Sequence, residues 1–300
     1  MTFAKKGKND MSLNRLVEHR GGVAIFLFFL YSYFNSVYAS QVPDRKTLIM
    51  GVFPIVSSGA LFKRFAPLKD YLEQELDRKL VLETAKDFPE FVRRTAKRQY
   101  DIVITAPHFS LLATDSGDYK IISRPKRDLV SLLVVPKDSK IIKLSQLSGK
   151  LIATPPAPAL STRSGKDYFK SKDLVAEKAP KFKAYKSHNA AYQAALANDA
   201  VAALVSINSV NKALDRGIPL RIVDRLPAMP AMPTLVATDL GDKLAGEIER
   251  VMVGMEATKH GKLVLKKVGF PGYLSAREKD YESVRPYKPG SSMIGSSSKK

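Results

Sequence analysis

The sequence of 300 residues contains no cysteine and no tryptophan, and it has only four histidines. Without cysteine the chain can form no disulfide framework, so its stability must come from its core alone. A cysteine nucleophile is excluded as well, and the four histidines do not have the spacing of a metal-binding cluster. No pair of carboxylates follows a predicted strand, so we expect neither an enzyme nor a cofactor.

Acidic residues are scarce relative to basic ones. The chain has 29 Asp and Glu against 49 Lys and Arg, which gives a formal net charge of +20. An excess of this size attracts anions and speeds their arrival. A nucleic-acid or a membrane partner would also fit the charge. However, the basic residues are scattered over many predicted helices and do not alternate with aromatic residues in a stripe, so we expect no nucleic-acid binding.

The first 39 residues have the layout of a secretory signal peptide. Basic residues precede an almost wholly apolar run, residues 21–34, and small residues occupy the −3 and −1 positions of a cut after Ala39. The alternative is a retained membrane anchor. A spanning helix needs roughly 20 apolar residues, and this run is shorter and is followed by Asn35. Translation from Met11 instead of Met1 would give a signal of more usual length.

The predicted mature chain begins at residue 40. The first 39 residues contain five Lys or Arg and two Asp or Glu, which leaves +17 on residues 40–300. No cysteine lies near residue 40, so a lipid-anchored form is excluded. A soluble exported protein of this kind is expected in the periplasm of a Gram-negative cell. About 261 residues suffice for two lobes of moderate size.

Short apolar runs alternate with helical patterns from residue 47 onward. The predicted strands of the first half are residues 47–53, 80–84 and 100–105, and the predicted helices are 60–76, with a kink or break at Pro67, and 88–98. Strands separated by helices favour parallel pairing with right-handed crossovers.

The same pattern restarts after residue 128. Further strands are predicted at 129–135, 150–154, 182–186, 200–207, 220–223 and 234–238, and further helices at 144–147, 161–170, 189–197, 208–216 and from about 241 to 268. We therefore divide the chain into a signal peptide (1–39), a first lobe (40–130), a second lobe (131–220), a return to the first lobe with C-terminal helices (221–286) and a disordered tail (287–300). The hinge crossings are expected within residues 127–135 and 218–236.

A ligand of an open α/β sheet lies beyond the carboxyl ends of its strands. The loops at those ends are residues 54–59, 105–109, 155–164, 187–190 and 206–209, and they are rich in hydroxyl groups. A helix start adds unpaired N–H groups and the positive end of the helix dipole, which together hold an oxyanion without a metal. Two alternatives remain open: Ser161 or Thr162 caps its own helix, and His188 is a structural histidine.

Four segments resemble the phosphate, phosphite and phosphonate-type solute-binding proteins of ABC transporters. YDIVITAPHFS (100–110) is similar to that family's "VDIAxxGPxSY", and STRSG (161–165) to its STSG. SHNAAYQAALANDAVAALVS (187–206) resembles "SHxAAxxAVxNGxVDAGAVS", and VGFPGYLSAREKDYESVR (268–285) resembles the closing "GFxPxxDxDYxPVR". In addition, GVFPIVSSGALFKRFAPLKDYLEQEL (51–76) is similar to the family's opening strand and first helix. The segments follow the family's order and spacing, and the resemblance covers nearly all of residues 48–286.

The resemblance implies a type II periplasmic binding protein fold, in which two α/β lobes joined by hinge strands surround a ligand cleft. It implies a monomer without a cofactor that binds a tetrahedral oxyanion and delivers it to an inner-membrane ABC permease. The residues it assigns to the ligand are Ser161, Thr162 and Ser164 as hydroxyl donors, His188 as a ring N–H donor, Thr105 and His108 in a facing loop, Ser57 and Ser58 after the first strand, and Ser206.

The sequence departs from the family pattern at several positions. Ile55 stands where many members have an aromatic residue, and no acidic residue follows Ser206. Without that carboxylate, an aminoalkyl phosphonate is disfavoured relative to a fully oxyanionic ligand of the phosphonate, phosphite or phosphate class. His108 replaces a small residue and either adds a donor or fills the site. A partner of a receptor kinase on the same fold is an alternative function, and an enzyme using Ser161 and His188 is a weaker one.

Overall fold

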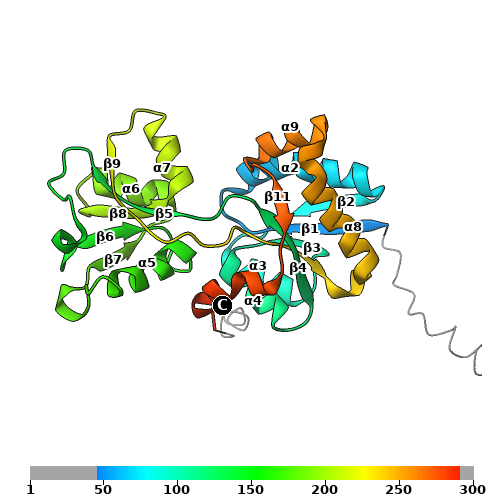
Figure 1. The fold of residues 1–300 in the computed structure, drawn as a ribbon, viewed down its shortest axis with the longest axis horizontal. Coiled ribbons are helices and arrows are strands. Elements are labelled where there is room, and N and C mark those ends of the chain that lie inside the picture. Colours follow the sequence, from blue (N-terminus) through cyan, green and yellow to red (C-terminus); the bar gives the residue numbers. More distant parts are fainter. Residues whose placement is uncertain (1–45, 291–300) are drawn as a thin grey trace, which may run out of the picture. The chain divides into compact units, whose positions relative to one another are not determined.

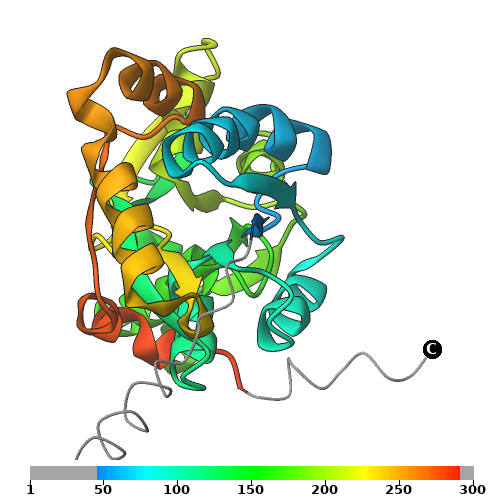
Figure 2. The same cartoon turned by 90° about the vertical axis from the view of Figure 1, so that its right-hand side faces the viewer.

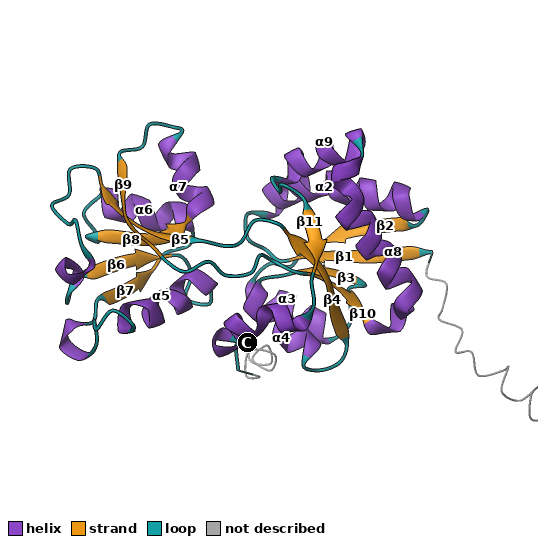
Figure 3. Ribbon diagram, in the orientation of Figure 1, coloured by secondary structure: helices purple, strands orange, loops and turns teal. Residues whose placement is uncertain are grey.

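The computed structural model describes residues 46–290, which form two α/β units, each built on its own sheet (Figures 1 and 3). The first sheet contains β1 (Thr47–Val52), β2 (Lys79–Glu83), β3 (Ile102–Ile104), β4 (Tyr119–Pro125), β10 (Thr234–Ala237) and β11 (Tyr273–Ser275). The second sheet contains β5 (Ser131–Pro136), β6 (Leu151–Thr154), β7 (Lys181–Ala184), β8 (Ala202–Ser206) and β9 (Leu220–Arg225). The two sheets confirm the predicted α/β fold class.

The helices divide between the two sheets in the same way. The first unit has α2 (Ser58–Leu76), α3 (Phe88–Ala96), α4 (Pro107–Thr114), α8 (Gly241–Gly254) and α9 (Lys259–Val268), and the second has α5 (Leu160–Lys170), α6 (His188–Leu196) and α7 (Ile207–Leu214). Short 3-10 helices are η1 (Leu144–Leu147), η2 (Ala176–Lys178), η3 (Thr238–Leu240), η4 (Met255–Ala257) and η5 (Glu278–Tyr287).

The first sheet has the strand order β11-β4-β10-β3-β1-β2. Its strand β1 pairs in parallel with both β2 and β3, as the alternating pattern predicts, whereas β10 is antiparallel to β3 and β4. Helix α2 packs against α8 and α9, which lie beside it in Figure 2. The apolar positions of α2, including Leu61, Phe65, Leu68 and Leu72, recur at helical spacing and are fully buried. The helix continues through Pro67, so a break there is wrong.

The second sheet has the order β7-β6-β8-β5-β9. Helices cover both faces of this sheet. Because its strands are buried on both sides, their sequences are continuous apolar runs. On one face Leu133, Ile152 and Leu204 pack against Phe169 of α5. On the other face the strands pack against residues of α6 and α7, among them Tyr192 and Val210. Figure 1 shows α5 on the opposite side of this sheet from α6 and α7.

Two chain segments, residues 126–130 and 226–233, connect the two sheets. The second lies within the predicted crossing 218–236, and the first begins at residue 126, one residue before the predicted crossing 127–135. The segments pair at one point, where the amides of Leu129 and Met229 each donate to the other residue's carbonyl at 2.8 and 2.9 Å. The predicted boundary at residue 220 is wrong, because β9 pairs with β5 of the second sheet up to Arg225. Residues 221–225 therefore belong to the second unit.

The C-terminal segment is ordered further than the predicted tail allows. Helix η5 ends at Tyr287, and the ammonium group of Lys288 forms an ion pair with Asp115 of the first unit, so the predicted start of the disordered tail at residue 287 is wrong. The remainder of the predicted tail and the predicted signal peptide lie outside the described residues. Among the helices within residues 46–290, none has the length and apolar composition needed to cross a membrane.

Candidate functional site

Three helix starts meet at one edge of the second sheet. Strands β7, β6 and β8 are parallel neighbours with β6 in the middle, so their carboxyl ends lie along the same edge. Helix α6 follows β7, α5 follows β6 and α7 follows β8. This topology brings Ser161, His188 and Ser206 to one end of the unit, where parallel α/β sheets hold their ligands.

The start of α5 is not capped by its own hydroxyl residues. The N-cap position is Ala159, so Ser161 and Thr162 are the second and third residues of the helix, and the cap alternative is wrong for both. The amide of Thr162 donates to the carbonyl of Ala159 at 3.0 Å. Within the part of the chain that the structure describes, the amides of Leu160 and Ser161 have no acceptor. This first turn therefore presents free N–H groups and the positive end of the helix dipole.

Two serines project from the same face of α5. Ser161 and Ser164 are three residues apart, which places them one turn above each other. The two residues are 9% and 7% exposed. Within residues 46–290 neither hydroxyl has a hydrogen-bond partner, and neither oxygen is among the fully buried polar atoms that lack one, so both stay accessible from solvent. The pair is therefore suited to donate to an acceptor supplied by a ligand.

The hydroxyl of Thr162 is already engaged. It lies 3.1 Å from the carbonyl oxygen of Pro155 and 3.2 Å from that of Pro156, and it donates its one proton to them. Thr162 therefore fixes the proline-rich loop ahead of the helix. Gly165 sets the position of α5 on the sheet, because a Cβ atom there would lie 2.1 Å from Cδ2 of Leu204 on β8.

His188 is the first residue of α6 and is half-buried. Its Nδ1 accepts a hydrogen bond from the backbone amide of Ser206 at 3.1 Å. Burial lowers the pKa of the imidazole to about 4, so the ring is neutral at pH 7 and carries its proton on Nε2. The ring is thus an oriented, uncharged N–H donor. The hydroxyl of Ser206 caps α7 by accepting from the amide of Ser209 at 3.3 Å, so it serves its own helix.

The predicted residues of the first unit also lie at one sheet edge. Ser57 and Ser58 follow β1, and Thr105 and His108 follow β3, its parallel neighbour. Ser57 occupies the N-cap position of α2, but its side chain makes no capping hydrogen bond, and both serines are exposed. Thr105 is buried, and its amide donates to the carbonyl of Pro233 at 3.3 Å.

His108 lies in helix α4 and not in a loop. Its Nε2 is 2.8 Å from the carbonyl oxygen of Pro158, and because a carbonyl only accepts, the ring donates from that atom. Burial lowers the pKa of His108 to about 4, and the ring stacks on Phe109 with centroids 4.3 Å apart. The imidazole therefore links the first unit to the loop that precedes α5.

The loop residues that hold the site were not predicted. The carbonyls of Pro155, Pro156 and Pro158 accept from Thr162 and His108, and the proline-rich composition of this loop was the only signal for them in the sequence. Arg163 points elsewhere: its guanidinium donates to the carbonyl of Tyr287 at 3.1 Å.

The chemistry available at this edge is hydrogen bonding. Residues 46–290 contain no group of His, Asp and Glu side chains that could hold a metal ion. In the first unit, a cavity of about 20 Å³ between α3 and α4, with Thr105 and Phe109 in its lining, has room for about one water molecule. The donors are hydroxyls, helix-start amides and a neutral imidazole, which together favour an anion with several oxygen acceptors.

Solved structures of periplasmic binding proteins share this fold. PhnD1 of Prochlorococcus marinus, solved in complex with methylphosphonate, has a TM-score of 0.70 and 18% identity and covers 81% of this chain and 97% of its own. A binding-protein component of a Pseudomonas aeruginosa ABC phosphonate transporter has a TM-score of 0.68 at 17% identity, covering 82% and 86%. A Xanthomonas citri protein solved bound to ATP has a TM-score of 0.68 at 16% identity, covering 85% and 100%.

Together these similarities show the type II periplasmic binding protein fold. The family described as "ABC transporter, phosphonate, periplasmic substrate-binding protein" matches residues 50–281, which include all the helix starts described above and both sheets apart from the first three residues of β1. The chain therefore belongs to the periplasmic substrate-binding proteins of phosphonate ABC transporters.

Proposed function

We propose that this protein binds a small phosphonate-class oxyanion in the periplasm and delivers it to an inner-membrane ABC permease. The observation that carries the proposal is the pair of uncommitted serine hydroxyls, Ser161 and Ser164, at the start of α5, at the same sheet edge as the oriented N–H donor of His188. The family membership and the methylphosphonate bound to the Prochlorococcus relative support the same ligand class.

The donors suit a ligand whose oxygens accept several hydrogen bonds. The helix-start amides of α5 add dipole-aligned N–H groups, and each hydrogen bond to a charged oxygen contributes roughly 1.5–3 kcal/mol. Ile207 and Asn208 follow Ser206 where an acidic residue would meet an amine. We therefore favour an alkylphosphonate, phosphite or phosphate over an aminoalkyl phosphonate.

We assign different roles to the nine predicted residues. Ser161, Ser164 and His188 contact the oxyanion directly. Thr162, Ser206 and His108 position those donors, because their own polar groups are bonded to the protein. Thr105, Ser57 and Ser58 supply the contacts from the first unit.

Calorimetry and thermal unfolding with a panel of anions test the proposal. The panel contains methylphosphonate, phosphite, phosphate, sulfate and 2-aminoethylphosphonate. A true ligand at 100 times its Kd adds about 2.7 kcal/mol to the free energy of unfolding, which a melting curve resolves. The S161A/S164A double variant should lose most of this stabilisation. S171A is its matched control, because Ser171 follows the far end of α5 and its hydroxyl donates to the carbonyl of Tyr168. If no anion of the panel binds, the proposed ligand class is wrong.

The remaining features of the proposed protein have simple tests. We infer that the exported chain is cut after Ala39, is monomeric, binds no nucleic acid and catalyses no reaction. Intact mass of the periplasmic form should begin at Ser40. Light scattering should give one chain per particle. A gel shift at about 150 mM salt, near physiological ionic strength, should show no complex with nucleic acid, and bound phosphonate should be recovered unchanged.

A further inference from the structure

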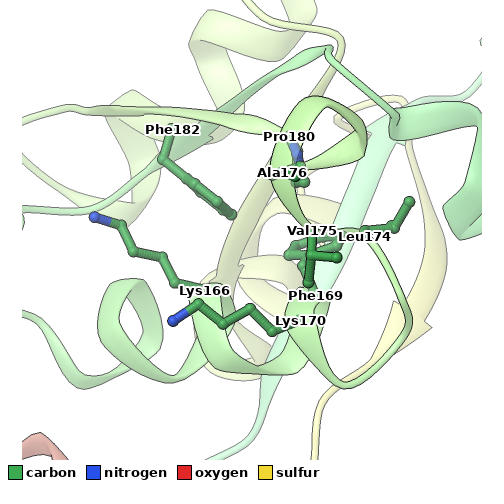
Figure 4. A pocket seen from close by; sticks show the side chains of 9 residues that line it. Lys166, Phe169, Lys170, Leu174, Val175, Ala176, Pro180 and Phe182 are labelled. Carbon is green, nitrogen blue, oxygen red and sulfur yellow. The ribbon is translucent and has the colours of Figure 1, made fainter.

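A second concave site lies in the second unit, on the half of α5 that is farther from Ser161. It is a pocket of about 230 Å³ between α5, the segment 174–180 and β7 (Figure 4). Lys170, at its rim, follows Ser161 by nine residues, which is about 13 Å along a helix axis. Lys166, also at the rim, follows Ser164 by two residues, and at 3.6 residues per turn these two side chains leave opposite faces of α5. The pocket therefore lies on a different face of α5 from the proposed oxyanion site.

The lining of the pocket is apolar. Its inner wall includes Phe169 and Leu174, which belong to the buried core of the unit, together with Phe182. Val175 is 48% exposed and stands at the edge of the same pocket. An apolar cavity of about 150 Å³ holds a benzene molecule. This larger pocket is matched in size to a chain of six to eight carbons.

The rim of the pocket is positively charged. Lys166 and Lys170 are four residues apart on α5, and their side chains extend along the same side of the pocket in Figure 4. Like charges at this spacing repel each other. Among the described residues, Lys166 has no acidic partner, and its ammonium lies 6.0 Å from the centre of the Phe182 ring. Lys170 is 3.4 Å from Asp167, but the two side chains are 68% and 51% exposed, so that pair is weak.

The charge extends beyond these two lysines. Residues 166–183 contain six lysines and three acidic residues. An anion placed between Lys166 and Lys170 would relieve their mutual repulsion and would lie in a positive local potential.

The backbone holds the apolar wall in place. Asp173 has φ of 58° and Ala176 has φ of 50°, so both occupy the left-handed region that residues other than glycine rarely adopt. These two residues flank Leu174 and Val175. Backbone conformations of this kind persist where the surrounding structure fixes them, and here they direct two apolar side chains to the pocket.

We propose that this pocket binds an anionic amphiphile, with an alkyl chain of six to eight carbons against Phe169, Leu174 and Phe182 and a carboxylate head group between the ammonium groups of Lys166 and Lys170. The apolar lining accommodates the alkyl chain, and the two lysines accommodate the carboxylate. A purely apolar ligand would leave the lysines unused, and a small anion would leave the apolar lining unused.

Isothermal titration of the full chain with sodium octanoate tests the proposal. Octanoate should bind with one-to-one stoichiometry, octanol about five- to tenfold more weakly because it lacks the charge, and acetate not at all. The K166Q/K170Q double variant should reduce octanoate affinity to the level of octanol. K172Q/K178Q removes the same charge from the same segment outside the pocket lining and should change affinity less than about twofold.

A pocket-filling variant separates this site from the oxyanion site. Ala179→Phe should abolish octanoate binding while leaving the melting temperature and methylphosphonate binding as in the unaltered protein. The proposal is overturned if octanol binds as tightly as octanoate or if the folded protein binds no octanoate. It is also overturned if K166Q/K170Q and K172Q/K178Q lower the affinity for octanoate equally. None of these results bears on the phosphonate site.

Discussion

The Nδ1 atom of His188 accepts a hydrogen bond from the backbone amide of Ser206 at 3.1 Å. This bond joins the start of α6 to the end of β8 and selects the ring form that carries its proton on Nε2. A histidine that is neutral, oriented and half-buried at a helix start can donate to an oxyanion without adding charge. The proposed ligand geometry depends on this orientation.

Replacing His188 by Asn tests that dependence. The Asn side chain can place an acceptor near the position of Nδ1 and so retain the bond to Ser206, but it lacks a donor at the position of Nε2. We expect phosphonate affinity to fall by about 10- to 150-fold, which corresponds to roughly 1.5–3 kcal/mol, with little change in melting temperature. Titration calorimetry measures the phosphonate affinity, and a thermal scan measures the melting temperature. Unaltered affinity in this variant would mean that the imidazole does not contact the ligand.

Thr162 and the serines on either side of it should respond differently to substitution. Thr162→Val removes the hydroxyl that donates to Pro155 and Pro156 and should lower the free energy of unfolding by about 1 kcal/mol. T162S keeps the hydroxyl and should recover most of this loss. S161A/S164A should instead lose ligand affinity with little loss of stability. Denaturant unfolding and calorimetry on the three variants distinguish the two roles, and equal effects on affinity would contradict the assignment.

The sequence predicted the strands with continuous apolar runs and missed the elements that depend on their neighbours. Strand β4 contains Lys120, Ser123 and Arg124, so its pattern is weak, and it is specified by pairing with β10 and β11. Residues 105–109 are predicted as a loop, whereas Pro107 is the first residue of helix α4. Proline at the first helical position is instead a common helix start.

The placement of the candidate residues was predictable at the level of the sheet edge. Parallel strands fix which loops share an edge, and this was sufficient to bring Ser161, His188 and Ser206 together. The individual hydrogen bonds were not predictable. His108 and Pro158 are 50 residues apart, and whether their side chain and carbonyl meet depends on packing that no local pattern encodes.

Gly165 tests how closely α5 must approach the sheet. An alanine Cβ there would collide with the side chain of Leu204, so G165A should destabilise the protein by about 1–3 kcal/mol. Leu204→Ala should create space for that Cβ, and the double variant should lose less stability than the sum of the two single variants. Urea unfolding of the four proteins gives the coupling. Simple additivity would show that the two residues do not compete for the same volume.

The pH dependence of stability should report the buried imidazoles. The pKa of His108 is lowered to about 4 chiefly by burial, with Arg163 acting in the same direction, whereas an unfolded histidine titrates near 6.5. Below pH 6.5 the unfolded chain takes up a proton that the folded ring resists until about pH 4. The free energy of unfolding should therefore fall as the pH falls from 6.5 to 4, by about 3 kcal/mol for this residue.

His108→Gln isolates that contribution. Glutamine can donate to Pro158 from a position near that of Nε2, but it does not titrate, so the bond is kept and the proton linkage is removed. Urea unfolding at pH 7 and at pH 4.5 should show a smaller difference for the variant than for the unaltered protein. The remaining slope in this window belongs to His188, whose pKa is also lowered to about 4 by burial, and to the other titrating groups of the chain. An identical slope in H108Q would mean that His108 is protonated as readily in the folded protein as in the unfolded chain, which its burial against Phe109 and Pro158 argues against.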